Sequence, residues 1–151
     1  MSQSLSKIFI HLVFHIKNQL VLVRSEDKPD LYSYIGAIIK DNGSIPIIVN
    51  GTDDHLHVFC IMSKNIALAK LDEEIKRHSS RWIKTRGSYY RQFAWQGGYA
   101  GFSVSPSLYE RTKNYIENQE EHHRKMTFKE ELEQFLKMYK IDFDEKYLWS
   151  N

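Results

Sequence analysis

The sequence contains only one cysteine, Cys60, so an intramolecular disulfide is excluded. A chain without a disulfide framework is typical of a reducing compartment, and we expect a cytoplasmic protein. Long hydrophobic runs are also missing, since no stretch approaches the roughly 18 apolar residues of a membrane span. The N-terminus, MSQSLSKIF, lacks the apolar core of a signal peptide. These absences predict a protein with no membrane partner.

Two further absences bound the architecture. No internal repeat, low-complexity tract or linker interrupts the chain, and the GxxxxGK[ST] phosphate loop of nucleotide hydrolases is missing. With 151 residues, of which 42% are hydrophobic, the chain is long enough to bury a core. We therefore predict a single domain over residues 1–151.

The net charge of +2 is too small to indicate a nucleic-acid partner, but the cations are unevenly distributed. Segment 76–91, KRHSSRWIKTRGSYYR, contains six lysines and arginines and no carboxylate. Cations that contact phosphates, with aromatic rings that stack on bases, are what a single-stranded nucleic-acid site needs. A solvated helix face followed by core aromatics is the alternative interpretation. The candidate DNA-binding residues are Lys76, Arg77, Arg81, Trp82, Lys84, Arg86 and Arg91.

Hydrophobic periodicity predicts strands that alternate with helices. The expected strands cover residues 5–16, 45–50, 55–62 and 99–105. The expected helices run from Pro29 to Asn42, over about 66–84, from Ser105 through Met126 as one long polar helix, and from Thr127 onward. Thr127 with Glu130 fits a capping box, and the apolar stripe of this last helix is interpreted as packing.

This order of elements predicts a ferredoxin-like α+β sandwich. We expect an antiparallel sheet with helices mainly on one face and an additional C-terminal helix. In that topology the first and third strands are central neighbours. His11 or His15 could then lie beside His55 or His57.

The stretch GTDDHLHVFCIM places two histidines at the start of the third strand. Side chains two residues apart on a strand point to the same face, so His55 and His57 project together. Two neutral imidazoles held in this way make half of a metal site. Polar residues on an exposed strand face are the alternative interpretation.

The stretch NYIENQEEHH contains a second pair, Tyr115 and Gln119, which are four residues apart and would share a helix face. A tyrosine ring packed on the core, with its hydroxyl in water, is the alternative. Spacing alone does not indicate that this helix meets the histidine strand.

Four motifs, DDHLHVF, KRHSSRWI, WQGGYAGFSVS and YIENQ, occur in this order in a chain of this length. The set resembles the single-tyrosine HUH transposases, which are the TnpA-type enzymes of insertion sequences and the REP-associated tyrosine transposases. HUH denotes two histidines separated by a bulky hydrophobic residue, and His55-Leu56-His57 matches it. Residues 115–119 match the family's Tyr-hydrophobic-x-x-Gln element. The resemblance extends from the first strand to Gln119.

The resemblance implies roles for particular residues. His55, His57 and Gln119 would be ligands of a divalent cation, and Tyr115 would be the nucleophile. Asp54 is a candidate for supporting the ligands. For His122, metal ligation, DNA contact and solvent exposure all stay open.

The resemblance also implies a function: a DNA transposase that nicks and rejoins single-stranded DNA at hairpin-bearing element ends. The intermediate would be a 5′-phosphotyrosine with a free 3′-hydroxyl. Two imidazoles and an amide oxygen accept Mg²⁺ or Mn²⁺. The implied partners are single-stranded DNA hairpins and a second copy in a homodimer, in a bacterial or archaeal cytoplasm near the nucleoid.

Two alternatives to this function remain. One is a non-catalytic ferredoxin-like nucleic-acid-binding protein, which would need neither the paired histidines nor the tyrosine with its glutamine. The other is a host-adopted HUH nuclease that no longer transposes.

Overall fold

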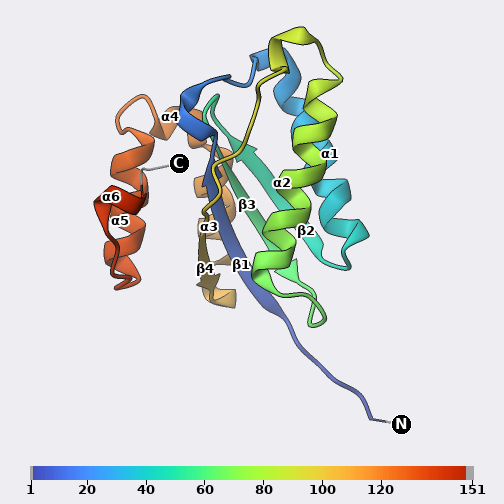
Figure 1. The fold of residues 1–151 in the computed structure, drawn as a ribbon. Coiled ribbons are helices and arrows are strands. Elements are labelled where there is room, and N and C mark those ends of the chain that lie inside the picture. The colour runs from blue at the N-terminus through green and yellow to red at the C-terminus, as the bar shows by residue number, and fades with distance from the viewer. Residues whose placement is uncertain (1, 149–151) are drawn as a thin grey trace.

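A computed structural model describes residues 2–148 and contains a four-stranded antiparallel sheet with helices on both faces (Figure 1). The strands are β1 (Ile8–His15), β2 (Ile45–Gly51), β3 (His55–Met62) and β4 (Ala100–Val104). They lie in the order β2-β3-β1-β4, and every pair is antiparallel. The predicted ferredoxin-like α+β fold is confirmed, with β1 and β3 as central neighbours, whereas the helices, expected mainly on one face, cover both faces.

Two layers of helices cover the sheet. The two longest, α1 (Lys28–Asp41) and α2 (Leu68–Lys84), share one face, while α3 (Tyr109–Glu117) and α5 (Phe128–Met138) lie on the other. Alternation along β1 explains both layers, because successive side chains of a strand point to opposite faces. Leu12 and Phe14 pack with α1 and α2, whereas Val13 packs with Leu132 and Leu136 of α5.

Helix α1 begins and ends where its sequence signals predict. Pro29 lies in its first turn, where the missing backbone N–H costs no helical hydrogen bond. At the other end, Asn42 Nδ2 donates to Ile38 O at 2.9 Å. Gly43 follows with φ +79°, a left-handed conformation that glycine adopts without strain.

The single long helix predicted from Ser105 through Met126 is wrong. The chain forms α3 and a separate helix, α4 (Gln119–His122), with Asn118 between them at φ −100° and ψ 28°. Asn118 Nδ2 donates to Asn114 O at 2.8 Å. Such a bond from an asparagine side chain competes with regular helical hydrogen bonding. After this break Gln119 is buried, although residues 117, 118 and 120 are exposed.

Helix α5 carries the predicted capping box. Thr127 Oγ1 accepts from Glu130 N at 3.2 Å, and Glu130 Oε1 accepts from Thr127 N at 3.5 Å. A short helix, α6 (Glu145–Leu148), follows, and four 3₁₀ turns occupy Lys17–Gln19, Ser25–Asp27, Ser88–Tyr90 and Pro106–Leu108. Among residues 2–148, no helix has the length and apolar character needed to cross a bilayer.

Candidate active site

His55 and His57 begin β3, and their side chains point toward α3 and α5. Both are buried there, with exposed fractions of only 1% for His55 and 0% for His57. The interpretation that they are polar residues on an exposed strand face is therefore wrong. The register of β1 against β3 pairs His15 with His55 and Val13 with His57. The expected proximity of a β1 histidine is confirmed by His11, whose Nε2 lies 2.7 Å from His57 Nδ1.

Asp54 and Thr52 fix the orientation of the His55 ring. His55 Nδ1 donates to Asp54 Oδ1 at 2.8 Å, and Thr52 Oγ1 donates to the same carboxylate oxygen at 2.9 Å. A hydrogen bond at one ring nitrogen sets the direction of the other, so Nε2 of His55 faces the interior of the site. The structure thus places Asp54 where a supporting residue was expected.

Gln119 reaches the histidines from α4. Its Oε1 lies 3.0 Å from His55 Nε2, and the side chain is fully buried. The break at Asn118, rather than a continuous helix face, directs Gln119 toward the sheet. The prediction that Tyr115 and Gln119 lie close together is therefore correct. The reason is the break between α3 and α4, and not a shared face of one continuous helix.

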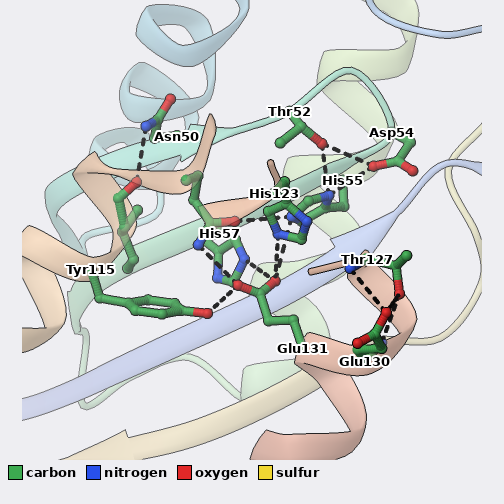
Figure 2. Close-up of polar contacts among 12 residues, drawn as sticks. Asn50, Thr52, Asp54, His55, His57, Tyr115, His123, Thr127, Glu130 and Glu131 are labelled. Atoms are coloured by element: carbon green, nitrogen blue, oxygen red, sulfur yellow. Dashed lines mark hydrogen bonds and ion pairs between the residues drawn. The ribbon is translucent and has the colours of Figure 1, made fainter. Parts of the chain in front are cut away.

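Tyr115 lies on α3 beside His57, with ring centroids 6.0 Å apart. Its ring also stacks on His122 at 4.6 Å, which gives His122 a packing contact rather than a position among the ligands. The Tyr115 hydroxyl donates to a carboxylate of α5, that of Glu131 (Figure 2). Burial, together with the charge of Glu131, raises the pKa of the Tyr115 phenol.

Glu131 stands at the centre of the site, and sequence reasoning missed it (Figure 2). Its Oε1 accepts from His57 Nε2 at 2.9 Å and from His123 Nε2 at 3.1 Å. Its Oε2 accepts from Gln119 Nε2 at 3.0 Å and from the Tyr115 hydroxyl. Burial favours the neutral acid, but hydrogen bonds from the histidines outweigh it and hold the pKa of Glu131 well below its usual range.

One signal in the sequence could have found Glu131. The apolar stripe of α5 runs through Phe128, Leu132 and Phe135, and a residue three positions after Phe128 falls on the same face. A glutamate at a core position needs a partner, because a buried unpaired carboxylate is costly. Its exposed fraction of 1% confirms that Glu131 belongs to the buried face.

The histidines differ in their electrostatics. Burial opposes a charge on His55, but hydrogen bonds to Asp54 and Glu131 outweigh it and raise the pKa of His55 to about 9. Burial lowers the pKa of His57 despite its bond to Glu131. Burial and the neighbouring His57 hold the pKa of His11 well below its ordinary value. The site thus favours one positive charge at His55, beside neutral imidazoles.

The donor set fits a divalent cation. One ligand atom each from His55, His57 and Glu131 lies within 4.8 Å of the others, and all three residues are buried. Gln119 Oε1 adjoins His55 Nε2, which adds an amide oxygen. An ion at these nitrogens would take the place of a proton. Two imidazoles with oxygen donors suit Mn²⁺ and accept Mg²⁺.

The basic segment 76–91 lies apart from this cluster, on α2 and the turn after it. Three of its cations are held by carboxylates from outside the segment. Lys76 Nζ lies 3.0 Å from Asp72 Oδ2, and Arg77 lies 2.5 Å from Glu74. Arg86 forms ion pairs with Asp27 at 3.2 Å and with Asp30 at 2.8 Å.

The remaining cations of this set face outward. Arg81, Lys84 and Arg91 are exposed, whereas the ring of Trp82 stacks on Tyr34 with centroids 5.1 Å apart. Within residues 2–148, these three cations are the members of the predicted DNA-binding set that present charge at the surface without a carboxylate partner.

A cleft of about 850 Å³ opens beside the histidine site. One wall contains His15 and residues 52–54, and the other contains residues 123–130. Asp54 and His123 therefore line the cleft and also contact the site. The cleft therefore lies one side chain away from the buried cluster.

Fold and site together define a class: a ferredoxin-like domain in which paired strand histidines face a tyrosine on a late helix. The chain belongs to the IS200-like transposase family, whose model, described as "Transposase IS200 like", matches residues 4–119. The suspected family is thereby confirmed. No protein with a curated description matches the sequence.

Two solved structures are similar in fold. A candidate transposase from Deinococcus radiodurans R1 is 19% identical, with a TM-score of 0.60 over 79% of this chain and 98% of its own. A REP-associated tyrosine transposase bound to a REP hairpin is 13% identical, with a TM-score of 0.58 over 82% of this chain and 74% of its own. At these identities the likeness concerns the fold alone.

Proposed function

We propose that this member of the transposase family nicks and rejoins single-stranded DNA, with Tyr115 as the nucleophile. The observation that carries the proposal is the convergence of four groups predicted from sequence. His55, His57, Gln119 and Tyr115 come from three elements and meet around the carboxylate of Glu131. A module that only bound nucleic acid would have no need for this buried polar cluster.

In the proposed step the phenol oxygen of Tyr115 attacks the phosphorus of a DNA phosphodiester. A bond forms between this oxygen and phosphorus while the bond from phosphorus to the 3′-oxygen breaks. The phenol loses its proton, and the departing 3′-oxygen gains one, so charge and atoms balance. The product is a 5′-phosphotyrosine with a free 3′-hydroxyl. A second 3′-hydroxyl can attack this ester and reverse the step, so the bond energy is retained.

His55, His57 and Gln119 would hold a divalent cation, with the Glu131 carboxylate also within reach. Such an ion, when bound, polarises a phosphate oxygen and stabilises the charge that develops on the attacking and leaving oxygens. The residues around it act by orientation. Asp54 holds the His55 ring through Nδ1, which keeps Nε2 aimed into the site.

We propose single-stranded DNA with an imperfect hairpin as the substrate. The REP-associated relative in complex with a REP hairpin has the same fold, which supports this proposal. Arg81, Lys84 and Arg91 supply exposed cations for the backbone. The packing of α5 on the sheet of the matched region supports one HUH domain over residues 1–151. The homodimer stays a prediction.

The proposal is tested by incubating the protein with Mn²⁺ and a labelled pool of single-stranded hairpin oligonucleotides. We expect a protein–DNA complex that survives SDS. Tyr115→Phe should abolish this adduct and leave DNA binding nearly unchanged, because only the hydroxyl is lost. An undiminished adduct with Tyr115→Phe would refute the assignment.

A matched control comes from the same helix. Tyr109 packs its ring against Phe9 and Phe59, with centroids 5.5 and 5.6 Å away, and so contributes packing to α3. Tyr109→Phe should therefore leave the adduct intact. His55→Ala and His57→Ala should each lose metal-dependent cleavage, and cleavage without metal in either variant would contradict the proposed ligand set.

A further inference from the structure

The carboxylate of Glu131 lies in a cage of hydrogen-bond donors. Its two oxygens accept from His57, His123 and Gln119 at 2.9, 3.1 and 3.0 Å, and from the Tyr115 hydroxyl. His55 Nε2 lies 3.5 Å from Oε1 as a further, longer contact, and the side chain is buried. A phosphodiester also presents two equivalent oxygens that share one negative charge. The cage is therefore built for an anion of this shape.

Glu131 occupies the position that a DNA phosphate would need in order to reach Tyr115. In the proposed reaction a phosphorus atom must come within bonding reach of the Tyr115 oxygen. The acceptor that Tyr115 contacts is instead Glu131 Oε2. A carboxylate and a phosphate in one buried cage would be two anions competing for the same donors, and their repulsion is strong where water is excluded.

Glu131 comes from a segment outside the matched family region. That region ends at Gln119, and α5 begins nine residues later, at Phe128. Its capping box makes α5 a self-contained unit, attached to the sheet mainly through apolar contacts of Leu132 and Leu136 with Val13 and Phe102. One hydrogen bond joins its C-terminal end to β4, from the Tyr139 hydroxyl to Ser103 O at 2.8 Å. The connection of residues 123–127 lines the open cleft. Apolar contacts of this kind carry no directional bond that a movement of α5 would have to preserve.

We infer that Glu131 occupies the place of the scissile phosphodiester, and that α5 withdraws from the cage when DNA enters. The inference rests on the proposed function for the identity of the DNA phosphate. With α5 in place, Tyr115 is held as a hydrogen-bond donor and cannot approach a phosphate. The groups that now surround the Glu131 carboxylate form the phosphate-binding site: His57 and Gln119, directly in the metal-free protein or through the ion they would hold, together with His123 and Tyr115. Glu131 is the intrachain competitor for this site.

Glu131→Gln distinguishes a competitor from an essential metal ligand. An amide has one oxygen, so it cannot accept from both pairs of donors, and the closed state is weakened. Loss of even one charge-assisted bond corresponds to about ten-fold in an equilibrium. We expect the adduct with the hairpin pool and Mn²⁺ to form about ten-fold faster in Glu131→Gln than in the unaltered protein. Glu145→Gln, an exposed change of the same charge, should leave the rate unaltered.

A second measurement needs no cleavage. Dimethyl phosphate, a phosphodiester with one charge, is titrated into metal-free protein, and binding is followed by histidine ¹⁵N NMR. Glu131→Ala should bind it about ten-fold more tightly than the unaltered protein, and Glu131→Ala with His123→Ala should lose the gain. Thermal unfolding establishes that each variant is folded.

The outcomes separate the two proposals. If dimethyl phosphate binds more tightly to Glu131→Ala but no variant forms an adduct, the competitor stands and the nicking function fails. If the unaltered protein forms the adduct while Glu131→Gln forms it at the same rate or more slowly, the competitor is overturned and the function stands. Unchanged dimethyl phosphate affinity in Glu131→Ala also overturns it.

Discussion

Raising the pH of the metal-free protein should remove stability that depends on the charge of His55. Hydrogen bonds to Asp54 and Glu131 outweigh burial and raise its pKa from 6.5 to about 9. A group with a higher pKa in the folded than in the unfolded protein holds its proton more tightly when folded. Its stabilising contribution is therefore complete below pH 6.5 and is lost as the pH rises through about 9.

The magnitude follows from the two pKa values. Each pH unit between them corresponds to about 1.4 kcal/mol, so the full contribution of His55 is about 3 kcal/mol. Between pH 7 and pH 9, about 2 kcal/mol of this should disappear. The pKa values of Asp54, Glu131 and His57 are all lowered, so these three groups keep their charge state over the same range.

The assay is urea unfolding in EDTA at several pH values, followed by tryptophan fluorescence. The free energy of unfolding should fall by about 2 kcal/mol from pH 7 to pH 9, with an unchanged dependence on urea. Asp54→Asn should flatten this fall, because it removes one of the two carboxylates bonded to His55. Asp53→Asn, an exposed neighbour with the same charge change, should preserve it. A free energy that stays constant or rises over this range refutes the reasoning.

Three further predictions concern packing, reactivity and charge. Gly51→Ala should destabilise the fold by about 3 kcal/mol, because the added Cβ would lie 2.1 Å from the backbone oxygen of His55. Gly36→Ala should instead stabilise the fold by about 0.5–1 kcal/mol in the same urea assay, because its added Cβ would have no neighbouring atom within 4 Å. Cys60 is buried with its pKa raised to about 11, so a thiol reagent such as DTNB should label it only as fast as the protein unfolds. Arg81→Ala should reduce the salt dependence of DNA affinity, measured by fluorescence anisotropy, by about one in log–log slope. Arg86→Ala should instead lower the urea midpoint, because Arg86 pairs with a buried aspartate.

The fold could be predicted because its signals are periodic and local. Alternation in β1 and β3 assigned each side chain to a face, and the order of elements then made these strands neighbours. That adjacency was enough to expect a β1 histidine beside the His55–His57 pair, and His11 fulfils the expectation. The Thr127 capping box was equally readable, since all its hydrogen bonds lie within three residues.

The completed site could be predicted only in part. Whether α3 reaches β3 depends on how it packs on the sheet, and Asn50 contributes by donating from Nδ2 to the carbonyls of Ile116 and Glu117 at 2.9 and 3.1 Å. Nothing in the local sequence around Tyr115 indicates this contact. The placement of Glu131 is likewise tertiary, since its partners lie between 8 and 76 residues away along the chain.

The basic segment illustrates a different limit. Within residues 76–91 no carboxylate is present, so the sequence alone presents every cation as available for DNA. In the folded chain, Asp72 and Glu74 lie one helical turn earlier and neutralise Lys76 and Arg77. Reading the i−3 and i−4 positions before the segment would have anticipated these two pairs.

The phenol and both strand imidazoles belong to one polypeptide, which has a kinetic consequence. In the proposed reaction, ester formation within one chain would be first order once DNA is bound, so its rate at saturating substrate should not depend on the protein concentration. For a site completed within one chain, a mixture of two inactive variants, one without the Tyr115 hydroxyl and one without the His57 ring, should stay inactive. Activity in the mixture would show instead that two subunits share a site.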